Sequence, residues 1–502
     1  MQTPVPISLP PGVVRQGTEY QSKGRWYDTS LVRFYEGTIR PAGGWIRVNN
    51  DEQLEGRPRA MLSWRPNSQN IARYLSVGTS AKLYAYDGNA IYDITPVGFM
   101  PGREDSIEGL GYGAGDYGES TYGTARAPDG RVLDASTWAL DTWGEYLVAC
   151  ATSDGKLYEW DLDTGGVADP IANAPEDNIA LLVTNEQILA ALGADSVARR
   201  VQWSDQRNNT VWTPASTNQA GDYDLKTDGA VVCGVRTRGE HLIFTDVDVH
   251  SMRYLGLPLV YGFDCVGTNC GVLGPNAVLA LSTMVVWWGD SGFFIYDGYT
   301  KPLPCSVLDF LAADLNAQQK VKVAAVHNGA FGEIWWFYPS VAGVENDRYV
   351  VWNYRENHWT IGALARTAGC DKGAFAYAQW AAPDGYWFEH EHGFTDNGAA
   401  RGALVYAYTG PIEPANGAQV QAIHQIIHDE SESANMLQLR IVGRQTPEGT
   451  QFNYGPYPLD QANGYTDVRA GGRQLSLRFE EVDAGDWRLG INRAMVTLKG
   501  KR

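Results

Sequence analysis

The chain has 502 residues, of which 44% are hydrophobic and only 20% charged, and its formal net charge is −18. The apolar share excludes a disordered chain, and no uncharged apolar stretch approaches the roughly 18 residues that a membrane-spanning helix needs. The excess of 58 acidic over 40 basic residues argues against a protein that grips nucleic acid by its phosphates, although DNA can slide past a negative wall. Because 56 glycines accompany 17 tryptophans and 27 tyrosines, we expect many short strands joined by tight turns, an all-β fold.

Residues 1–57 are expected to form an N-terminal β segment. The first twelve residues, MQTPVPISLPPG, have no basic region and carry prolines where an apolar core should be, so we expect no secretory signal. Two short strands are expected within Lys23–Trp45. Extended terminal strands of this kind are able to complete the sheet of a neighbouring subunit.

Residues 58–410 repeat one pattern, an apolar strand followed by a strand that ends in an aromatic residue and Asp before a Gly turn. Examples of the second strand are Lys82–Asp93, Lys156–Asp161 and Gly292–Gly298. Asp suits this place because its carboxylate accepts N–H groups of the turn. Imperfect repetition at about 40–45 residues is typical of a β-propeller, for which we expect six or seven blades with loop insertions such as 101–131. Two β-sandwiches are the alternative.

Two stretches of the repeat region have amphipathic patterns of helical length. These are Ser306–Lys320 and a shorter stretch at Asn178–Ile188, and both are expected to be helices. Residues 411–502 differ in style, with alternating apolar and polar residues at Gln438–Gly443, Gln474–Phe479 and Met495–Lys499. The alternation predicts a C-terminal antiparallel β domain with one wet face, able to close back onto the propeller.

The six cysteines, at positions 150, 233, 265, 270, 305 and 370, do not form a strong metal motif. Only Cys265 and Cys270 are close in sequence, and a single C-x4-C pair is a weak zinc signal. We expect buried free thiols from a reducing compartment. Asp222, Asp224, Asp246 and Asp248 are expected to cap turns, because nothing in the sequence sets paired carboxylates at a catalytic separation.

Histidines offer two spacings that a metal ion is able to use. His424 and His428 are four residues apart, as in zinc proteases, but Gln425 stands where the catalytic Glu belongs. His390 and His392 alternate along an expected strand and suit a metal site in a cupin-like barrel, but no further ligand appears at matching spacing. We interpret all four as surface or packed residues.

No other motif indicates chemistry. The sequence has no nucleophile elbow or P-loop, and the glycine-rich Gly111–Gly118 lies in a loop crowded with tyrosines. Tryptophan and tyrosine side chains are able to bind sugars or stack bases, but we expect most of them to pack between sheets. We therefore predict no catalytic, cofactor-binding or metal-binding residue, no cofactor, and no enzyme activity.

Four segments resemble the tail nozzle or stabilisation proteins of short-tailed bacteriophages. They are Leu9–Trp45, Val77–Pro96, Arg199–Pro214 with its Trp203-Ser204-Asp205 and Trp212, and the end of the chain from Gly472. The resemblance implies a β-propeller with added β domains and a homohexameric ring below the portal–adaptor complex. The ring would enclose the channel through which DNA leaves without sequence-specific binding.

The implied protein is a virion part of the tail, assembled in the host bacterial cytoplasm, with tail fibres or a tail needle as further partners and no membrane insertion. No catalytic residue carries over from that family. A closed ring requires heterologous contacts between subunits, and an acidic wall suits a channel for a polyanion. Two other functions stay open: a receptor-binding tail protein that recognises host glycan, and a propeller-type glycan lyase or hydrolase.

Overall fold

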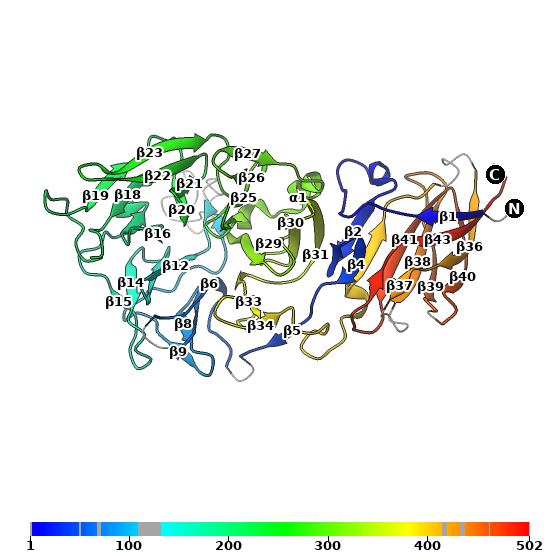
Figure 1. The fold of residues 1–502 in the computed structure, drawn as a ribbon, viewed down its shortest axis with the longest axis horizontal. Helices are drawn as coiled ribbons and strands as arrows, with labels where there is room; N and C mark the ends of the chain where they lie inside the picture. Colours follow the sequence, from blue (N-terminus) through cyan, green and yellow to red (C-terminus); the bar gives the residue numbers. More distant parts are fainter. Residues whose placement is uncertain are drawn as a thin grey trace, which may run out of the picture.

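A computed structural model describes residues 3–49, 52–67, 72–108, 132–413, 419–431, 437–460 and 462–500. Strands make up 47% and helices 5% of the structure, which confirms the predicted all-β class. The strands form many small antiparallel sheets, and none of the sheets in the described residues closes into a barrel. Figure 1 shows an elongated molecule with one group of sheets on the left and centre and a second group on the right.

Seven four-stranded sheets make up the first group. The first three sheets contain β6 Pro58–Trp64, β7 Tyr74–Thr79, β8 Leu83–Tyr86 and β9 Ile91–Asp93; β12 Trp138–Trp143, β13 Tyr146–Ala151, β14 Leu157–Trp160 and β15 Asp169–Pro170; and β16 Ala180–Val183, β17 Leu189–Leu192, β18 Arg200–Trp203 and β19 Gly221–Asp224. The next three contain β20 Val231–Arg236, β21 His241–Thr245, β22 Val249–Gly256 and β23 Val260–Gly267; β24 Val278–Ala280, β25 Val285–Gly289, β26 Gly292–Tyr296 and β27 Thr300–Leu303; and β28 Ala324–Asn328, β29 Glu333–Tyr338, β30 Arg348–Asn353 and β31 His358–Ala363.

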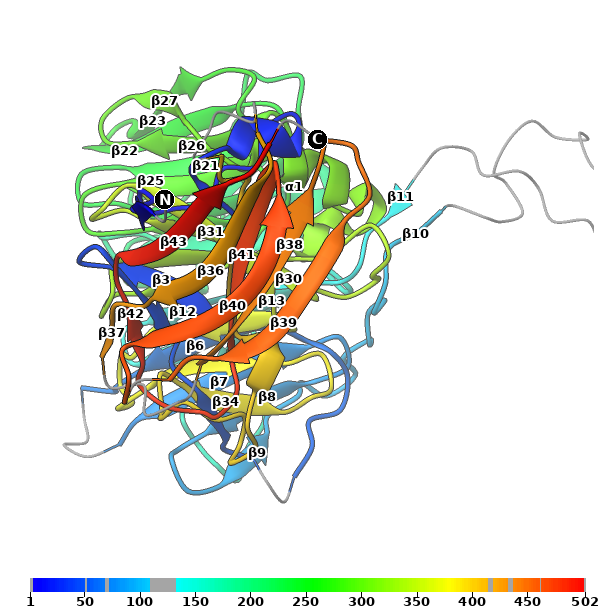
Figure 2. The ribbon, with the colours of Figure 1, turned by 90° about the vertical axis from the view of Figure 1, so that its right-hand side faces the viewer.

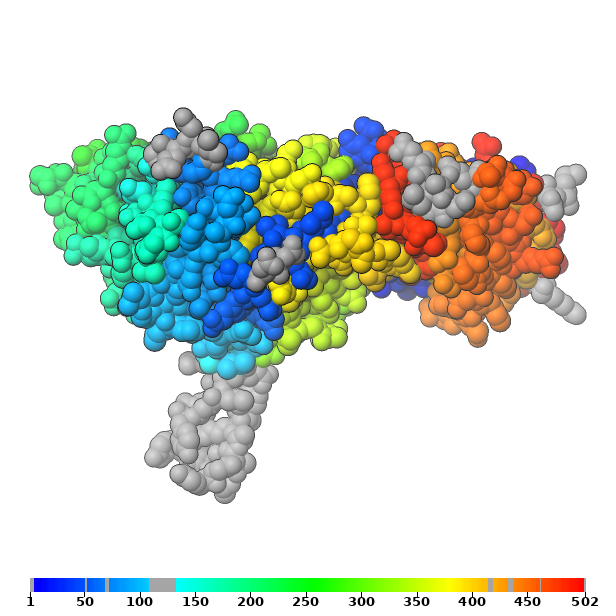
Figure 3. Space-filling view, turned by 90° about the horizontal axis from the view of Figure 1, so that it is seen from below, coloured from blue at the N-terminus to red at the C-terminus, as the bar shows by residue number. Residues whose placement is uncertain are grey.

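The seventh sheet joins the two ends of this group. It contains β32 Ala368–Cys370, β33 Ala378–Ala381, β34 Trp387–His390 and, from the N-terminal segment, β5 Trp45–Arg47. β5 pairs antiparallel with β34, with His390 opposite Trp45 and Phe388 opposite Arg47. Figure 3 shows the dark-blue N-terminal residues lying among the yellow residues of this sheet.

The first strands of the seven sheets contact one another in a closed circle. β6 contacts β12, β12 contacts β16, and the succession continues through β20, β24 and β28 to β32, which contacts β6. Each sheet therefore has an inner strand that faces the centre of the group and an outer strand at its periphery.

The second group of sheets is built from both ends of the chain. One sheet contains β1 Thr3–Ile7, β43 Asn492–Leu498, β36 Gln421–Ile427 and β40 Tyr465–Gly472; another contains β2 Trp26–Ser30, β35 Tyr406–Thr409, β41 Gln474–Glu481, β38 Leu437–Arg444 and β39 Phe452–Pro458; a third contains β3 Val32–Tyr35, β4 Thr38–Pro41, β42 Arg488–Leu489 and β37 Glu430–Ser431. Figure 2 looks onto this end of the molecule. The strands expected at Gln438–Gly443, Gln474–Phe479 and Met495–Lys499 are present as β38, β41 and β43.

Helices are short. They are α1 Leu308–Asp314 and the 3-10 segments η1 Glu19–Ser22, η2 Ala194–Ser196, η3 Ala317–Lys322 and η4 Gly402–Leu404. The helix expected at Ser306–Lys320 is thus present in part, because Leu315 and Asn316 have extended backbone between α1 and η3. The prediction of a helix at Asn178–Ile188 is wrong, because Ala180–Val183 forms the strand β16, in which every residue is buried. Since both faces of this strand are buried, its sequence lacks the apolar–polar alternation that a strand usually shows.

Most of the insertion expected at 101–131 lies outside the described residues. At its base, β10 Ile107–Glu108 pairs with β11 Val132–Leu133. In the part of the chain that is described, no helix combines the length and hydrophobicity needed to cross a membrane.

Aromatic side chains fill the spaces between sheets. Every tryptophan except Trp143 is buried. Trp335, for example, lies 5.3 Å from Trp380 of the next sheet, measured between ring centroids. The prediction that most tryptophans are packing residues is confirmed.

Glu481 is a buried carboxyl group in the second group of sheets, only 1% exposed. Its Oε2 accepts a hydrogen bond from Trp487 Nε1 at 2.9 Å and lies 3.9 Å from Arg401 Nη2. Burial raises the pKa of Glu481 to about 6, against the lowering effects of Trp487 and Arg401. The folded protein binds the proton of Glu481 more tightly than the unfolded chain does, so protonation of Glu481 stabilises the fold at low pH. This contribution is lost as the pH rises from the pKa of Glu481 in the unfolded chain through its pKa in the folded protein.

We expect the substitution Glu481→Gln to remove this pH-dependent loss of stability. Relative to the variant, the wild type should lose about 2 kcal/mol of unfolding free energy between pH 4 and pH 8, at roughly 1.36 kcal/mol per pKa unit. Denaturant unfolding of both proteins across this range measures the difference. The exposed Glu176→Gln is the control, and an unchanged pH dependence in Glu481→Gln would contradict the assignment.

Candidate functional site

The inner strands of the seven sheets enclose a central cavity of about 460 Å³. All seven sheets contribute to its wall, with many small side chains. The lining alanines are Ala60, Ala139, Ala180, Ala280, Ala324, Ala325 and Ala368. At roughly 30 Å³ per water molecule the cavity has room for about 15 waters. It cannot admit a double helix, whose major groove alone is about 12 Å wide.

An ion pair stands at the wall of this cavity and bridges three sheets. Asp141 of β12 lies 2.7 Å from Arg236 of β20, between Oδ1 and Nη2, and accepts the backbone N–H of Val183 of β16 at 3.0 Å. Burial raises the pKa of Asp141, and the positive charge of Arg236 opposes the rise. Because both oxygens of Asp141 are engaged within the chain, the carboxylate acts as a bridge between sheets.

A second set of charges lies beside the cavity and is also satisfied internally. Arg59, which lines the cavity, forms two hydrogen bonds to Glu345, at 2.8 and 2.6 Å. The buried Lys322 contacts Glu345 at 3.1 Å and Asp105 at 2.5 Å through its Nζ. The two positive and two negative charges therefore balance one another within the chain.

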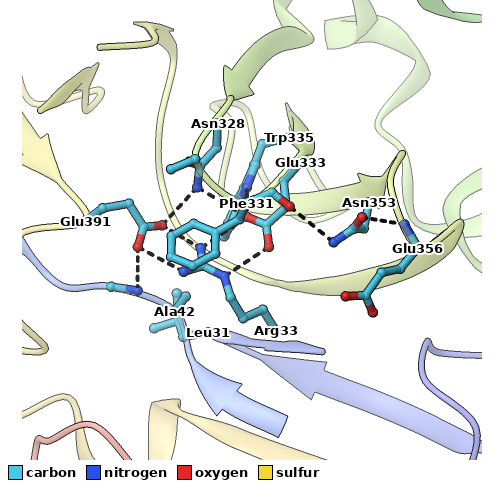
Figure 4. Close-up of polar contacts among 12 residues, drawn as sticks. Leu31, Arg33, Ala42, Asn328, Phe331, Glu333, Trp335, Asn353, Glu356 and Glu391 are labelled. Atoms are coloured by element: carbon cyan, nitrogen blue, oxygen red, sulfur yellow. Dashed lines mark hydrogen bonds and ion pairs between the residues drawn. The ribbon is translucent and has the colours of Figure 1, made fainter. Parts of the chain in front are cut away.

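The two groups of sheets meet at a buried charge cluster around Arg33 of β3 (Figure 4). Arg33 Nε lies 2.9 Å from Glu333 of β29, and its Nη1 and Nη2 lie 2.9 and 2.5 Å from the two oxygens of Glu391, which follows β34. Asn328 donates to both carboxylates, at 3.2 and 3.0 Å. The guanidinium also lies over the ring of Phe331, 3.6 Å from its centroid. The cluster therefore joins three sheets through one side chain.

Electrostatics in this cluster depend on burial. Burial raises the pKa of Glu333 even though Arg33 opposes the rise. Burial also acts to raise the pKa of Glu391, but Arg33, Asn328 and the backbone N–H of Gly43 lower it below its ordinary value. The guanidinium of Arg33 lies between the carboxylates of Glu333 and Glu391, so its positive charge attracts both and fixes their positions.

Among the described residues, none of the four histidines singled out from the sequence belongs to a converging group of three metal-ligating side chains. His390 is buried, its ring lies 4.0 Å from that of Trp380, and its Nε2 accepts a hydrogen bond from Arg366 at 2.8 Å. β34 ends at His390, so the expected alternation with His392 on one strand is wrong. The cause is Glu391, whose φ of +61° turns the chain toward Arg33.

His424 and His428 also differ in setting. His424 lies in β36 at an irregularity of the strand register, and His428 follows the end of that strand. His428 is buried, with its Nδ1 3.1 Å from Glu430. His390, His392 and His428 thus contact side chains of the same chain, and His424 is half-buried.

The turn-capping expectation holds for some of the acidic residues. Asp87, in the repeated aromatic-Asp-Gly pattern, accepts the backbone N–H groups of Asn89 and Ala90 at 2.8 Å each, and Asp248 accepts a hydrogen bond from Thr245 across its turn. It is wrong for Asp222 and Asp224, which lie in β19, where Asp224 pairs with Arg200 at 2.9 Å. Asp246 accepts the N–H of Ala230 at 2.7 Å, from outside its own turn. Gly111–Gly118 lies outside the described residues.

The cysteines are all free, and their setting corrects one expectation. Cys150, Cys233, Cys270 and Cys305 are buried and Cys370 is half-buried, but Cys265 is exposed. Cys265 lies next to Asp248 and His250, and within the described residues these three form the one group of metal-ligating side chains that converge. This trio was not among the sites predicted from the sequence, although the Asp-Val-His alternation at 248–250 ahead of a cysteine is a usable signal.

The segment Trp203-Ser204-Asp205, on which the resemblance to tail proteins depends in part, supports local structure. Asp205 Oδ1 accepts the backbone N–H groups of Gln206 and Gln219, and Trp203 Nε1 donates to the carbonyl of Gln219 at 2.8 Å. Trp212 Nε1 donates to the carbonyl of Asn209 at 2.7 Å. These contacts fold the connection between β18 and β19 onto its sheet.

We expect Arg33→Met to destabilise the protein by about 3–5 kcal/mol at neutral pH, because it leaves the buried Glu333 and the half-buried Glu391 without a cation. Denaturant unfolding measures the loss, which should shrink at acidic pH where the carboxyl groups are protonated. Arg253→Met is the matched control, since Arg253 is largely exposed and pairs with Glu240 at 2.8 Å. Equal effects of the two substitutions would refute a special role for the cluster.

Comparison with known proteins gives no relative. No protein-family model matches the chain, and a search of curated proteins finds no significant match. The function must therefore be inferred from the residues and their arrangement.

Proposed function

We propose that the protein is a structural subunit of a bacteriophage tail that assembles into a closed homohexameric ring, the nozzle around the DNA channel. In this proposal it retains packaged DNA and takes part in its ejection. Each subunit consists of a seven-bladed β-propeller and a β domain made from both chain ends. Three features support this function: the circle of seven sheets, the pairing of charged groups within the chain, and an exposed apolar surface for assembly.

The circle of inner strands supports the propeller. Seven antiparallel sheets of four strands follow one another along the chain, and their first strands contact in a closed succession from β6 to β32 and back. The last sheet borrows β5 from the N-terminal segment, a closure that ties the first and last blades together. Two separate β-sandwiches would not produce such a circle.

The engagement of charged groups supports a structural role over an enzymatic one. Asp141, Arg59, Lys322 and the Arg33 cluster each have partners within the chain, and the cavity that Asp141 and Arg59 line is small. Because all tryptophans but one are buried, the glycan-binding alternative has to rely on tyrosines.

The observation that carries the assembly proposal is the hairpin between β22 and β23. Leu255, Leu257 and Leu259 at its tip are 56%, 62% and 69% exposed, and no charged residue occurs between Arg253 and Asp264. A protruding apolar tip of this kind marks a surface that a partner covers. A closed ring requires that one patch of each subunit bind a different patch of the next, and a tip that docks into the neighbouring copy meets this requirement.

The DNA path follows from the size of the central cavity. Since a double helix does not fit inside one subunit, the channel of the proposed ring lies between six subunits. The net charge of −18 suits its wall, because negative potential repels the phosphates and keeps the duplex from sticking. The portal–adaptor complex above and tail fibres or a tail needle below are the partners of this arrangement.

Ring formation is the decisive test. Native mass spectrometry of the purified protein, alone and with the portal–adaptor complex, should show an assembly of six 55.1 kDa chains in one or both conditions. Leu257→Asp with Leu259→Asp should abolish the assembly and leave a folded monomer, because two charges would be buried at the contact. Val341→Asp is the control, since Val341 is also exposed at 67% but lies away from the hairpin. A stable monomer or trimer under both conditions would refute the nozzle.

A further inference from the structure

Three ligand-type atoms converge at the base of the same hairpin. A carboxylate oxygen of Asp248, an imidazole nitrogen of His250 and Sγ of Cys265 all lie within 4.8 Å of one another. His250 Nε2 is 3.1 Å from Asp248 Oδ1. Asp248 and His250 are buried and Cys265 is exposed, so the group opens to solvent on the side of the thiol.

Local structure fixes two of the three side chains. Thr245 and Asp248 close the tight turn between β21 and β22, where Thr245 Oγ1 accepts the N–H groups of Val247 and Asp248. The same hydroxyl donates to Asp248 Oδ1 at 2.6 Å and so orients the carboxylate. His250 follows two residues later on β22 and points to the same face, because side chains alternate along a strand.

The third side chain arrives through an irregularity of strand pairing. His250 pairs with Cys265, but the preceding residue of β22, Val249, pairs with Gly267, so Val266 is an extra residue on β23. A bulge of this kind re-aims the side chains beside it. Here it sets Cys265 directly opposite His250.

We propose that Asp248, His250 and Cys265 form a zinc-binding site with a fourth position open to solvent. Zinc accepts imidazole nitrogen, thiolate sulfur and carboxylate oxygen in tetrahedral geometry, with bonds of about 2.0–2.3 Å. Such bonds place a nitrogen and an oxygen ligand about 3.3 Å apart, close to the 3.1 Å between His250 and Asp248. The hydrogen bond from Thr245 is the outer-shell support that metal-ligating carboxylates usually have.

The ligand chemistry favours zinc over other common ions. Calcium and magnesium select oxygen ligands in larger numbers, whereas a thiolate and an imidazole suit a softer divalent ion. A bound ion would link the β21–β22 turn to β23 and so fix the base of the hairpin. This site is independent of the proposed tail function, since it is defined within one chain.

Metal titration of the full-length protein tests the proposal. After chelator treatment under reducing conditions, zinc should bind with one equivalent per chain by isothermal titration calorimetry. Cobalt(II) should give the near-ultraviolet absorption of a thiolate-to-cobalt charge transfer. Affinity should fall as pH is lowered, because the ligands must lose their protons.

Two matched pairs of variants assign the ligands. Cys265→Ser should abolish the charge-transfer band and weaken zinc binding by about 10- to 100-fold or more, while Cys370→Ser keeps both. Asp248→Asn should weaken binding, whereas Asp264→Asn, at the exposed neighbour of Cys265, should not. Because Cys265 is exposed, its substitution is expected to leave the fold intact. No binding, or a band that survives in Cys265→Ser, would overturn the proposal.

Discussion

The pairing of β5 with β34 constrains the whole arrangement of sheets, because it ties the N-terminal segment to the last of the seven sheets. Residues 45–47 complete a sheet whose other strands lie more than 300 residues later in the chain. The seventh sheet therefore has its fourth, outer strand only when both parts of the chain are in place. Arg33 and Glu391 flank this strand pair in sequence and hold the same junction by charge, so the closure is supported by hydrogen bonds and by a buried ion cluster together.

The distribution of charge explains how an acidic protein keeps a stable interior. Three of its buried cations, Arg33, Arg59 and Lys322, each contact carboxylates, and these contacts link segments that are distant in sequence. Breaking such a pair leaves an uncompensated charge, so these contacts specify the arrangement of the sheets more than they add net stability. The excess negative charge therefore lies at the surface, where it opposes self-association and repels polyanions such as DNA.

The sheet β20–β23 contains two features suited to binding, one for a protein partner and one for a metal ion. Its hairpin exposes three leucines at the tip, and Asp248, His250 and Cys265 converge at the base. A metal ion bound at the base would reduce the motion of the tip and lower the entropy lost when the tip docks. The two proposals are physically compatible, yet each depends on different residues.

The all-β class, the packing role of tryptophan and the turn-capping role of Asp87 could be predicted from the sequence, because they follow from composition and from contacts within a few residues. The prediction for Ala180–Val183 is wrong, since a strand buried on both faces has no alternation to distinguish it from a helix. Only the tertiary structure decided that Trp45–Arg47 joins the sheet of β34, that Arg33 meets Glu333 and Glu391, and that Cys265 faces His250. The first two contacts join residues that are about 300 or more positions apart in the chain. The third depends on a strand register shifted by one residue. Local sequence patterns predict neither.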